Sequence, residues 1–221
     1  MNLNSLSRGR SLAVGVAASL VFGLIAAASA GAAVLDISPS GISVAGVALA
    51  GADCSAPALS QPFLSWGDTN QYVLAPGQQT DDFVGTGWTL YGDASLASAT
   101  LLDGHVGSVL DLAPGSIVLS PPVCVASDYP SARTIIRGAT GAGVLVGVVY
   151  SDVLAAGVTE PILHTALSGT IGGSSTWAPS ARFTVHPGDL PGWQVVQFVF
   201  ANLSPGDVQL YDFYVDPRMS D

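Results

Sequence analysis

The sequence predicts an all-β domain, an antiparallel β-sandwich, and three observations indicate it. From residue 61 onward the chain consists of short apolar runs separated by Gly, Pro, Asp and Ser. Turn-forming pairs such as Pro76-Gly77 and Pro205-Gly206 recur at the spacing typical of sandwiches. No segment after the first thirty residues offers ten residues of helical periodicity.

About eight to ten strands are expected, each an apolar or branched run bounded by turn residues. In order, they cover residues 72–75, 88–91, 95–102, 108–112, 116–119, 133–137, 144–150, 181–185, 194–200 and 208–215. The run 144–150 is apolar on both faces, which predicts a central strand covered on both sides. The closing run 211–217 alternates aromatic or branched residues with carboxylates, the pattern of a half-buried last strand.

The first thirty residues have the layout of a secretory signal. Arg8 and Arg10 precede an apolar run over 11–25, and Ala28-Ser29-Ala30 offers the small side chains that a signal peptidase accepts. We therefore expect cleavage before Gly31 and a secreted, extracellular protein. The alternative is an uncleaved membrane anchor, but the run is rich in Ala, Ser and Gly and makes a poor membrane span.

Three parts are expected along the chain. A signal-peptide helix covers 1–30, and a run of small and branched residues over 31–53 reads as a flexible arm. The rest, 54–221, has the length of one β-sandwich domain and enough apolar residues for an ordinary core.

The chain is acidic and contains no lysine. Its formal net charge is −10. Two of the six arginines leave with the signal, and the remaining four arginines and sixteen acids give a net charge of −12. Such a surface repels phosphate backbones and anionic lipids. We expect no nucleic-acid partner, and no membrane partner after cleavage.

Cys54 and Cys124 are the only two cysteines. Export places them in an oxidising compartment, so we predict a disulfide between them. The alternative, a reactive or metal-binding pair, lacks CxxC spacing and a nearby histidine.

A series of short motifs follows a specific order along the chain. They are QPFLSWGD at 61–68, YVLAPG at 72–77, GWTL at 87–90, SPPVCV at 120–125 followed by Pro130 and Arg133, Trp177 with Pro179, Phe198, and YVDP at 214–217. Together they resemble a family of exported proteins from high-GC Gram-positive bacteria that has no established activity. The resemblance covers nearly all of 54–218 and implies a jelly-roll sandwich similar to carbohydrate-binding modules.

The similarity to carbohydrate-binding modules also implies a structural calcium ion, because many such sandwiches hold one between an early acidic turn and a late Asp-Asp strand. Asp81 and Asp82 match the early acids, and Asp212 matches the second acid of the late pair. Tyr211 replaces the first acid, which removes one ligand. The alternative is that Asp81 and Asp82 are turn residues and Asp212 is a hydrogen-bonded acid at a strand end. No other cofactor is expected.

Catalytic motifs are not found in the sequence. His105, His164 and His186 lack zinc spacing, and no G-x-S-x-G elbow occurs. His105, Ser108 and Asp111 have the composition of a triad, but an offset of three places His105 and Ser108 on opposite faces of a strand. We therefore expect a protein that is not an enzyme.

Binding of a glycan or a cell-envelope component is the function we expect, since sugar recognition needs flat aromatic faces and a few polar groups on a rigid sheet. Trp193, beside Pro191-Gly192, is the best candidate for a solvent-facing platform, and Trp88 is expected in the core. Arg133 and Arg137 share one strand face, where they pair with carboxylates or face the ligand. A structural or surface-interaction domain is the alternative, and an extracellular hydrolase is a weaker one.

Overall fold

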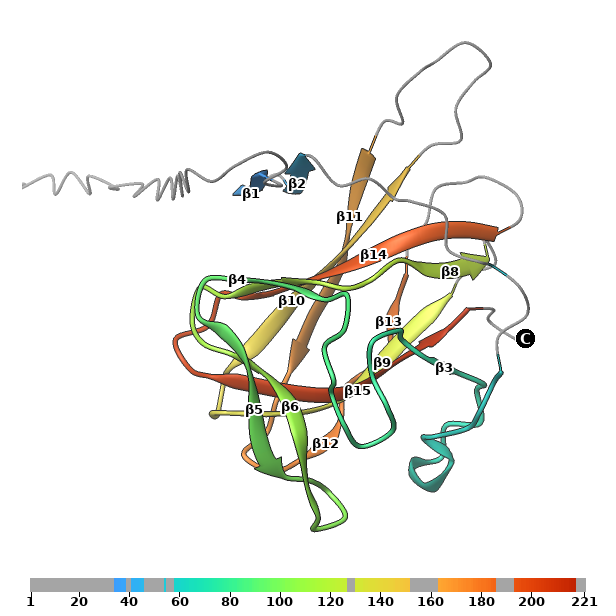
Figure 1. Cartoon of the computed structure of the whole chain (residues 1–221), viewed down its shortest axis with the longest axis vertical. Coiled ribbons are helices and arrows are strands. Elements are labelled where there is room, and N and C mark those ends of the chain that lie inside the picture. The colour runs from blue at the N-terminus through green and yellow to red at the C-terminus, as the bar shows by residue number, and fades with distance from the viewer. Residues whose placement is uncertain are drawn as a thin grey trace, which may run out of the picture.

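Two antiparallel sheets pack face to face in this protein (Figure 1). The computed structural model describes residues 34–38, 41–45, 54, 58–126, 130–151, 163–185 and 193–217. For 34–38, 41–45, 151, 163–167 and 193 it describes the backbone alone. The predicted fold class, an all-β jelly-roll sandwich, is confirmed, whereas the predicted signal peptide lies outside the described residues.

The first sheet has the strand order β11-β10-β14-β7-β4, and β8 also pairs with β14. Its strands are β4 (Thr89–Tyr91), β7 (Ile117–Leu119), β8 (Val123–Ala126), β10 (Gly143–Ser151), β11 (Leu163–Gly172) and β14 (Trp193–Asn202). The apolar strand β10 pairs with β11 on one side and β14 on the other, so its prediction as a central strand is confirmed.

The second sheet has the order β12-β9-β15-β6-β5, with β13 paired to β9 and β3 paired to β15. Its strands are β3 (Val73–Leu74), β5 (Ala94–Thr100), β6 (Val106–Leu112), β9 (Ser131–Gly138), β12 (Ala178–Pro179), β13 (Phe183–Thr184) and β15 (Val208–Asp216). The last strand of the chain therefore lies in the middle of this sheet, between β9 and β6.

Aromatic side chains fill the space between the sheets. Phe213 of β15 packs against Phe198 and Phe200 of β14, with ring centroids 4.8 and 5.0 Å apart, and against Trp88 at 6.3 Å. Trp88 is 7% exposed, which confirms its expected place in the core. Burial of such rings is the main contribution to the stability of the sandwich.

A bulge in β15 turns two tyrosines toward the outer face of the second sheet. Tyr211 pairs with Ile135, and Tyr214 pairs with Arg133. The two tyrosines are three residues apart in β15, whereas their partners are only two residues apart in β9. The extra residue is Asp212, whose backbone has a φ of 51°. Tyr211 and Tyr214 consequently point away from the core, although strict alternation would send them to opposite faces.

The expectation that the last strand is half-buried is wrong. Eight of the nine residues of β15 are buried, because other segments cover its outer face. The 3-10 turn η1 (Leu64–Trp66) and the residue before it lie on one part, where Phe63 packs on Tyr214 with centroids 5.6 Å apart. Trp177, just before β12, packs on Tyr211 at 4.9 Å.

All ten predicted strands overlap strands of the structure. The sequence did not predict β8, β11, β12 or the hairpin formed by β1 (Val34–Ser38) and β2 (Gly41–Ala45) within the expected arm. Among the described residues, no helix is long and apolar enough to cross a membrane.

A disulfide joins Cys54 to Cys124, as predicted, with their Cα atoms 5.5 Å apart. Cys124 belongs to β8, so the bond ties residue 54 to the first sheet. The closed loop spans 70 residues of sequence. A loop of this length removes about 4 kcal/mol of chain entropy from the unfolded state in the simple model.

Candidate functional site

A hollow of about 520 Å³ opens on the outer face of the second sheet. We call it the Trp66 depression, and its lining includes Phe63, Trp66, Asp81, Leu102, Tyr211 and Asp212. Four segments meet there: the η1 turn, the turn at 80–81, the tip of the β5–β6 hairpin and the bulge of β15. In Figure 1 the η1 turn and the hairpin tip lie at the same, lower side of the molecule.

Trp66 is the exposed aromatic residue of this depression. It ends the η1 turn, and Gly67 closes the turn in a left-handed conformation with a φ of 79°. Trp66 is 47% exposed, and its ring centroid lies 6.2 Å from that of the buried Phe63. One part of the indole is therefore supported by the protein, and the other faces solvent at the edge of a hollow.

Asp81 and Asp212 contact each other in the wall of the Trp66 depression. The backbone N–H of Asp81 donates to Oδ1 of Asp212 at 2.8 Å. Asp212 is only 6% exposed, and burial raises the pKa of its carboxyl to about 7, although the hydrogen bond from Asp81 opposes this rise. A side chain at Gly107 would place its Cβ 2.4 Å from the carbonyl oxygen of Asp81, so only glycine lets this turn pack on β6.

Tyr211 and Tyr214 form the floor. The hydroxyl of Tyr211 accepts a hydrogen bond from the backbone N–H of Leu102 at 3.3 Å, which joins the hairpin tip to β15. Burial raises the pKa of each tyrosine to about 12, so both hydroxyls stay protonated at neutral pH. The floor is therefore uncharged and aromatic.

Asp103 and His105 form an ion pair on the hairpin tip, with Nδ1 of His105 2.6 Å from a carboxylate oxygen of Asp103. This hydrogen bond lowers the pKa of Asp103 and raises the pKa of His105. Both side chains are exposed, and Asp103 lines the depression. The pair was not predicted.

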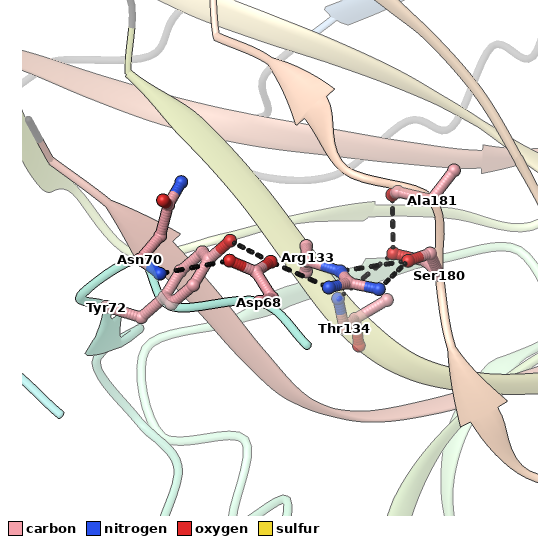
Figure 2. Close-up of polar contacts among 7 residues, drawn as sticks. All are labelled: Asp68, Asn70, Tyr72, Arg133, Thr134, Ser180 and Ala181. Carbon is pink, nitrogen blue, oxygen red and sulfur yellow. Dashed lines mark hydrogen bonds and ion pairs between the residues drawn. The ribbon is translucent and has the colours of Figure 1, made fainter. Parts of the chain in front are cut away.

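Arg133 fastens the η1 loop to the sheet (Figure 2). Its guanidinium lies 2.7 Å from Oδ2 of Asp68, donates twice to the Ser180 carbonyl, and stacks 4.7 Å from the centroid of Phe63. Tyr72 donates to the same Asp68 oxygen at 2.8 Å. Partial burial acts to raise the pKa of Asp68, but hydrogen bonds from Tyr72, Arg133 and the Asn70 N–H outweigh it and lower the pKa. The predicted pairing of Arg133 with a carboxylate is confirmed.

A second, smaller hollow of about 370 Å³ lies on the other side of Trp66 and is lined by Arg133 and the exposed Arg182. Arg137 lies on the same strand face as Arg133, as predicted. It donates to Oε1 of Gln209 at 2.8 Å and stacks 4.4 Å from the centroid of Trp177. Both strand arginines thus hold protein partners, and their role toward a ligand stays a prediction.

Trp193, the predicted platform, begins β14 opposite Ala126. Its side chain lies outside the described residues, so its role also stays a prediction.

The three predicted calcium ligands do not form one cluster. Asp81 and Asp212 are in contact, but Oδ1 of Asp82 instead accepts the backbone N–H of Ser108 at 3.2 Å. Within the described ranges, no group of three or more His, Cys, Asp or Glu residues has a geometry suited to a metal ion. The placement of these three residues therefore does not fit a carboxylate-rich calcium site.

The residues with the composition of a catalytic triad do not converge. His105 pairs with Asp103, and Oγ of Ser108 donates to the Phe83 carbonyl at 3.0 Å. The geometry supports no nucleophile held by a base at this place.

Sequence reasoning did not single out Trp66. The available signal was its position just before Gly67-Asp68, since a tryptophan in a turn next to a left-handed glycine is hard to bury completely.

No protein-family model matches the chain, and no curated protein matches it. Among solved structures, a xylan-binding domain of the CBM22 type is similar with a TM-score of 0.43 and 11% identity, over 70% of this chain and 99% of that one. A CBM22-1–GH10 portion of Clostridium thermocellum xylanase 10B, complexed with xylohexaose, has a TM-score of 0.43 and 12% identity. The match covers 59% of this chain but only 26% of the xylanase chain. CsCBM6-3 from Clostridium stercorarium, in complex with cellobiose, has a TM-score of 0.36 and 16% identity, and the match covers 67% of this chain and 93% of that one. At these TM-scores we draw no functional conclusion from the similarities.

Proposed function

We propose that the protein is a secreted, non-catalytic β-sandwich that binds a glycan, for example one of the cell envelope, in the Trp66 depression. The observation that carries this proposal is the half-exposed indole of Trp66 beside a hollow with carboxylates on its wall. Sugar rings stack their C–H faces on such an indole, and their hydroxyls donate to carboxylate oxygens.

The floor of the depression is built for rigidity. Tyr211 packs between Trp177 and the hairpin tip, and Tyr214 packs on Phe63, so a ligand meets side chains that are already held in place. Preorganised walls reduce the entropy that binding costs. The Arg133–Asp68 ion pair holds the η1 turn, and with it Trp66, in the same way.

Export, and membership of a family of exported proteins from high-GC Gram-positive bacteria, are part of the proposal. Export is supported by the disulfide between Cys54 and Cys124, since such bonds persist in oxidising compartments.

The test is isothermal titration calorimetry of the domain with a panel of xylo-, cello- and chito-oligosaccharides. We expect Trp66→Ala to weaken binding at least about tenfold, as loss of an aromatic stacking platform does. Leu64→Ala is the matched control, because Leu64 is 54% exposed in the same turn but does not line the depression. Equal affinities of the wild type and Trp66→Ala would overturn the proposal.

A structural interaction domain is the second candidate. Val84, Leu96 and Val106 are 40%, 45% and 70% exposed on or beside the β5–β6 hairpin, where a protein partner has apolar side chains to cover. Light scattering that shows a dimer dissociated by Val106→Asp, without any glycan binding, would favour this candidate.

A further inference from the structure

The charged side chains that line the Trp66 depression are all acidic. Asp81, Asp103 and Asp212 line it, and its lining includes no arginine. The nearby cation, His105, is exposed and already paired with Asp103, while Arg133 is paired with Asp68 and faces the smaller hollow. The chain as a whole carries a net charge of −10. Anionic ligands are repelled from such a site, and cations are attracted to it.

Asp212 provides an independent observation, an acceptor oxygen to which no described protein group donates. Its Oδ1 accepts the N–H of Asp81, whereas its Oδ2 accepts no hydrogen bond from the described residues. Asp212 is only 6% exposed, and it lines the depression. Oδ2 is not one of the completely buried atoms that lack a partner, so a donor on a ligand in the depression can reach it and bond to it.

The chemistry of that donor follows from its surroundings. A sugar hydroxyl satisfies Oδ2 with a neutral hydrogen bond, but an ammonium group makes a charge-assisted bond, which is roughly twice as strong. An ammonium group also gains from the carboxylates of Asp81 and Asp103 and from the face of the Trp66 indole. Its presence in turn favours the ionised form of Asp212.

Resting on the proposed function, we infer that the Trp66 depression selects glycans with free amino groups, such as oligomers of glucosamine, over N-acetylated, neutral or uronic-acid glycans. Asp212 holds the ammonium group, Asp81 and Asp103 supply the negative field, and Trp66 supports the sugar ring.

Calorimetry with a glucosamine tetrasaccharide and its fully N-acetylated counterpart, at neutral pH, tests the inference. We expect the free amine to bind about tenfold more tightly at low salt, and the difference to shrink at high salt because screening weakens the interaction. A galacturonic-acid tetrasaccharide should show no binding.

Asp212→Asn removes the charge but retains an oxygen that accepts the Asp81 N–H, so we expect it to abolish the preference while the acetylated oligomer still binds. Asp93→Asn is the control, because Asp93 is exposed in the β4–β5 turn, does not line the depression, and changes the net charge equally. We expect it to retain the preference.

If the acetylated or a neutral oligomer binds as tightly as the amine, the inference is overturned while the proposed function stands. If no oligosaccharide of any class binds, both are overturned. Loss of the preference in Asp93→Asn to the same extent as in Asp212→Asn also contradicts the inference, since it would reflect net charge alone.

Discussion

The backbone N–H of Asp81 donates to Oδ1 of Asp212 across 131 residues of sequence, at 2.8 Å. Both residues have left-handed backbones, with φ of 60° and 51°, which is uncommon for residues other than glycine. One lies in the β3–β4 connection and the other at the bulge of the last strand. Their bond therefore joins two separate segments at the wall of the Trp66 depression.

The buried carboxyl of Asp212 predicts an unusual pH dependence of stability. Its pKa in the folded protein is about 7, above the ordinary value of 3.8, so between these values the folded state binds a proton that the unfolded state has released. The stabilising contribution is present below about pH 4 and is lost as the pH rises through 7. It amounts to a few kcal/mol, since each pKa unit corresponds to roughly 1.4 kcal/mol.

Asp212→Asn removes this titration and keeps an acceptor for the Asp81 N–H. We expect the variant to be more stable than the wild type above pH 7, with a difference that shrinks toward pH 4. Urea unfolding of both proteins across this range measures it. Parallel stability curves for the two proteins would show that Asp212 is not buried as a carboxyl of raised pKa.

The ion pair between Arg133 and Asp68 predicts a large cost for its removal. The two side chains are 15% and 11% exposed, so Arg133→Ala leaves a mostly buried carboxylate without its cation. We expect a loss of about 3 kcal/mol. Arg182→Ala, which removes an exposed arginine from the neighbouring hollow, should change stability by less than about 0.5 kcal/mol.

A double-mutant cycle with Asp68→Ala separates the pair from its surroundings. Urea unfolding of the four proteins should give a coupling free energy of at least about 1 kcal/mol. Additive effects of the two substitutions would contradict a direct interaction.

The disulfide between Cys54 and Cys124 predicts a lower melting temperature in Cys124→Ser. About 4 kcal/mol of loop entropy corresponds to a decrease of roughly 10 °C for a domain of this size, with the same sheet content by circular dichroism. The wild type in dithiothreitol is the matched control and should melt like the variant. Unchanged melting in both samples would mean that the thiols are not bridged in solution.

Calcium is expected to leave the melting temperature unchanged, because Asp82 bonds to Ser108 instead of joining Asp81 and Asp212. If a calcium site exists, calcium at a hundred times its dissociation constant adds about 2.7 kcal/mol to the free energy of unfolding. Differential scanning calorimetry in calcium and in EDTA detects such a gain easily. A rise of several degrees in calcium would restore the predicted calcium site.

The strands and the fold class were predictable from the sequence, because turn residues between branched runs are a local signal. Strand β11 was missed because Ser168, Gly169 and Thr170 interrupt its apolar pattern, although its backbone pairs with β10 along its length except for a bulge at Ser168. The half-buried pattern expected of β15 was wrong, because segments distant in sequence cover its outer face.

The site was predictable only in part. Asp81, Asp82 and Asp212 were selected together through resemblance, and the structure places Asp81 and Asp212 in contact but holds Asp82 on Ser108. The exposure of Trp66 has one local signal, its place in a turn just before Gly67. The outward turn of both Tyr211 and Tyr214 depends on a bulge that has no local sequence signal. Tertiary packing, and not residue type, decided which aromatic residue faces solvent.

Nuclear magnetic resonance tests the central claim, a glycan bound in the Trp66 depression, most directly. In ¹⁵N–¹H spectra titrated with the tightest oligosaccharide of the panel, we expect the largest shifts at the indole N–H of Trp66 and the amides of Asp81, Leu102 and Asp212. Shifts concentrated instead around Trp193, or no shifts at saturating oligosaccharide, would contradict the account.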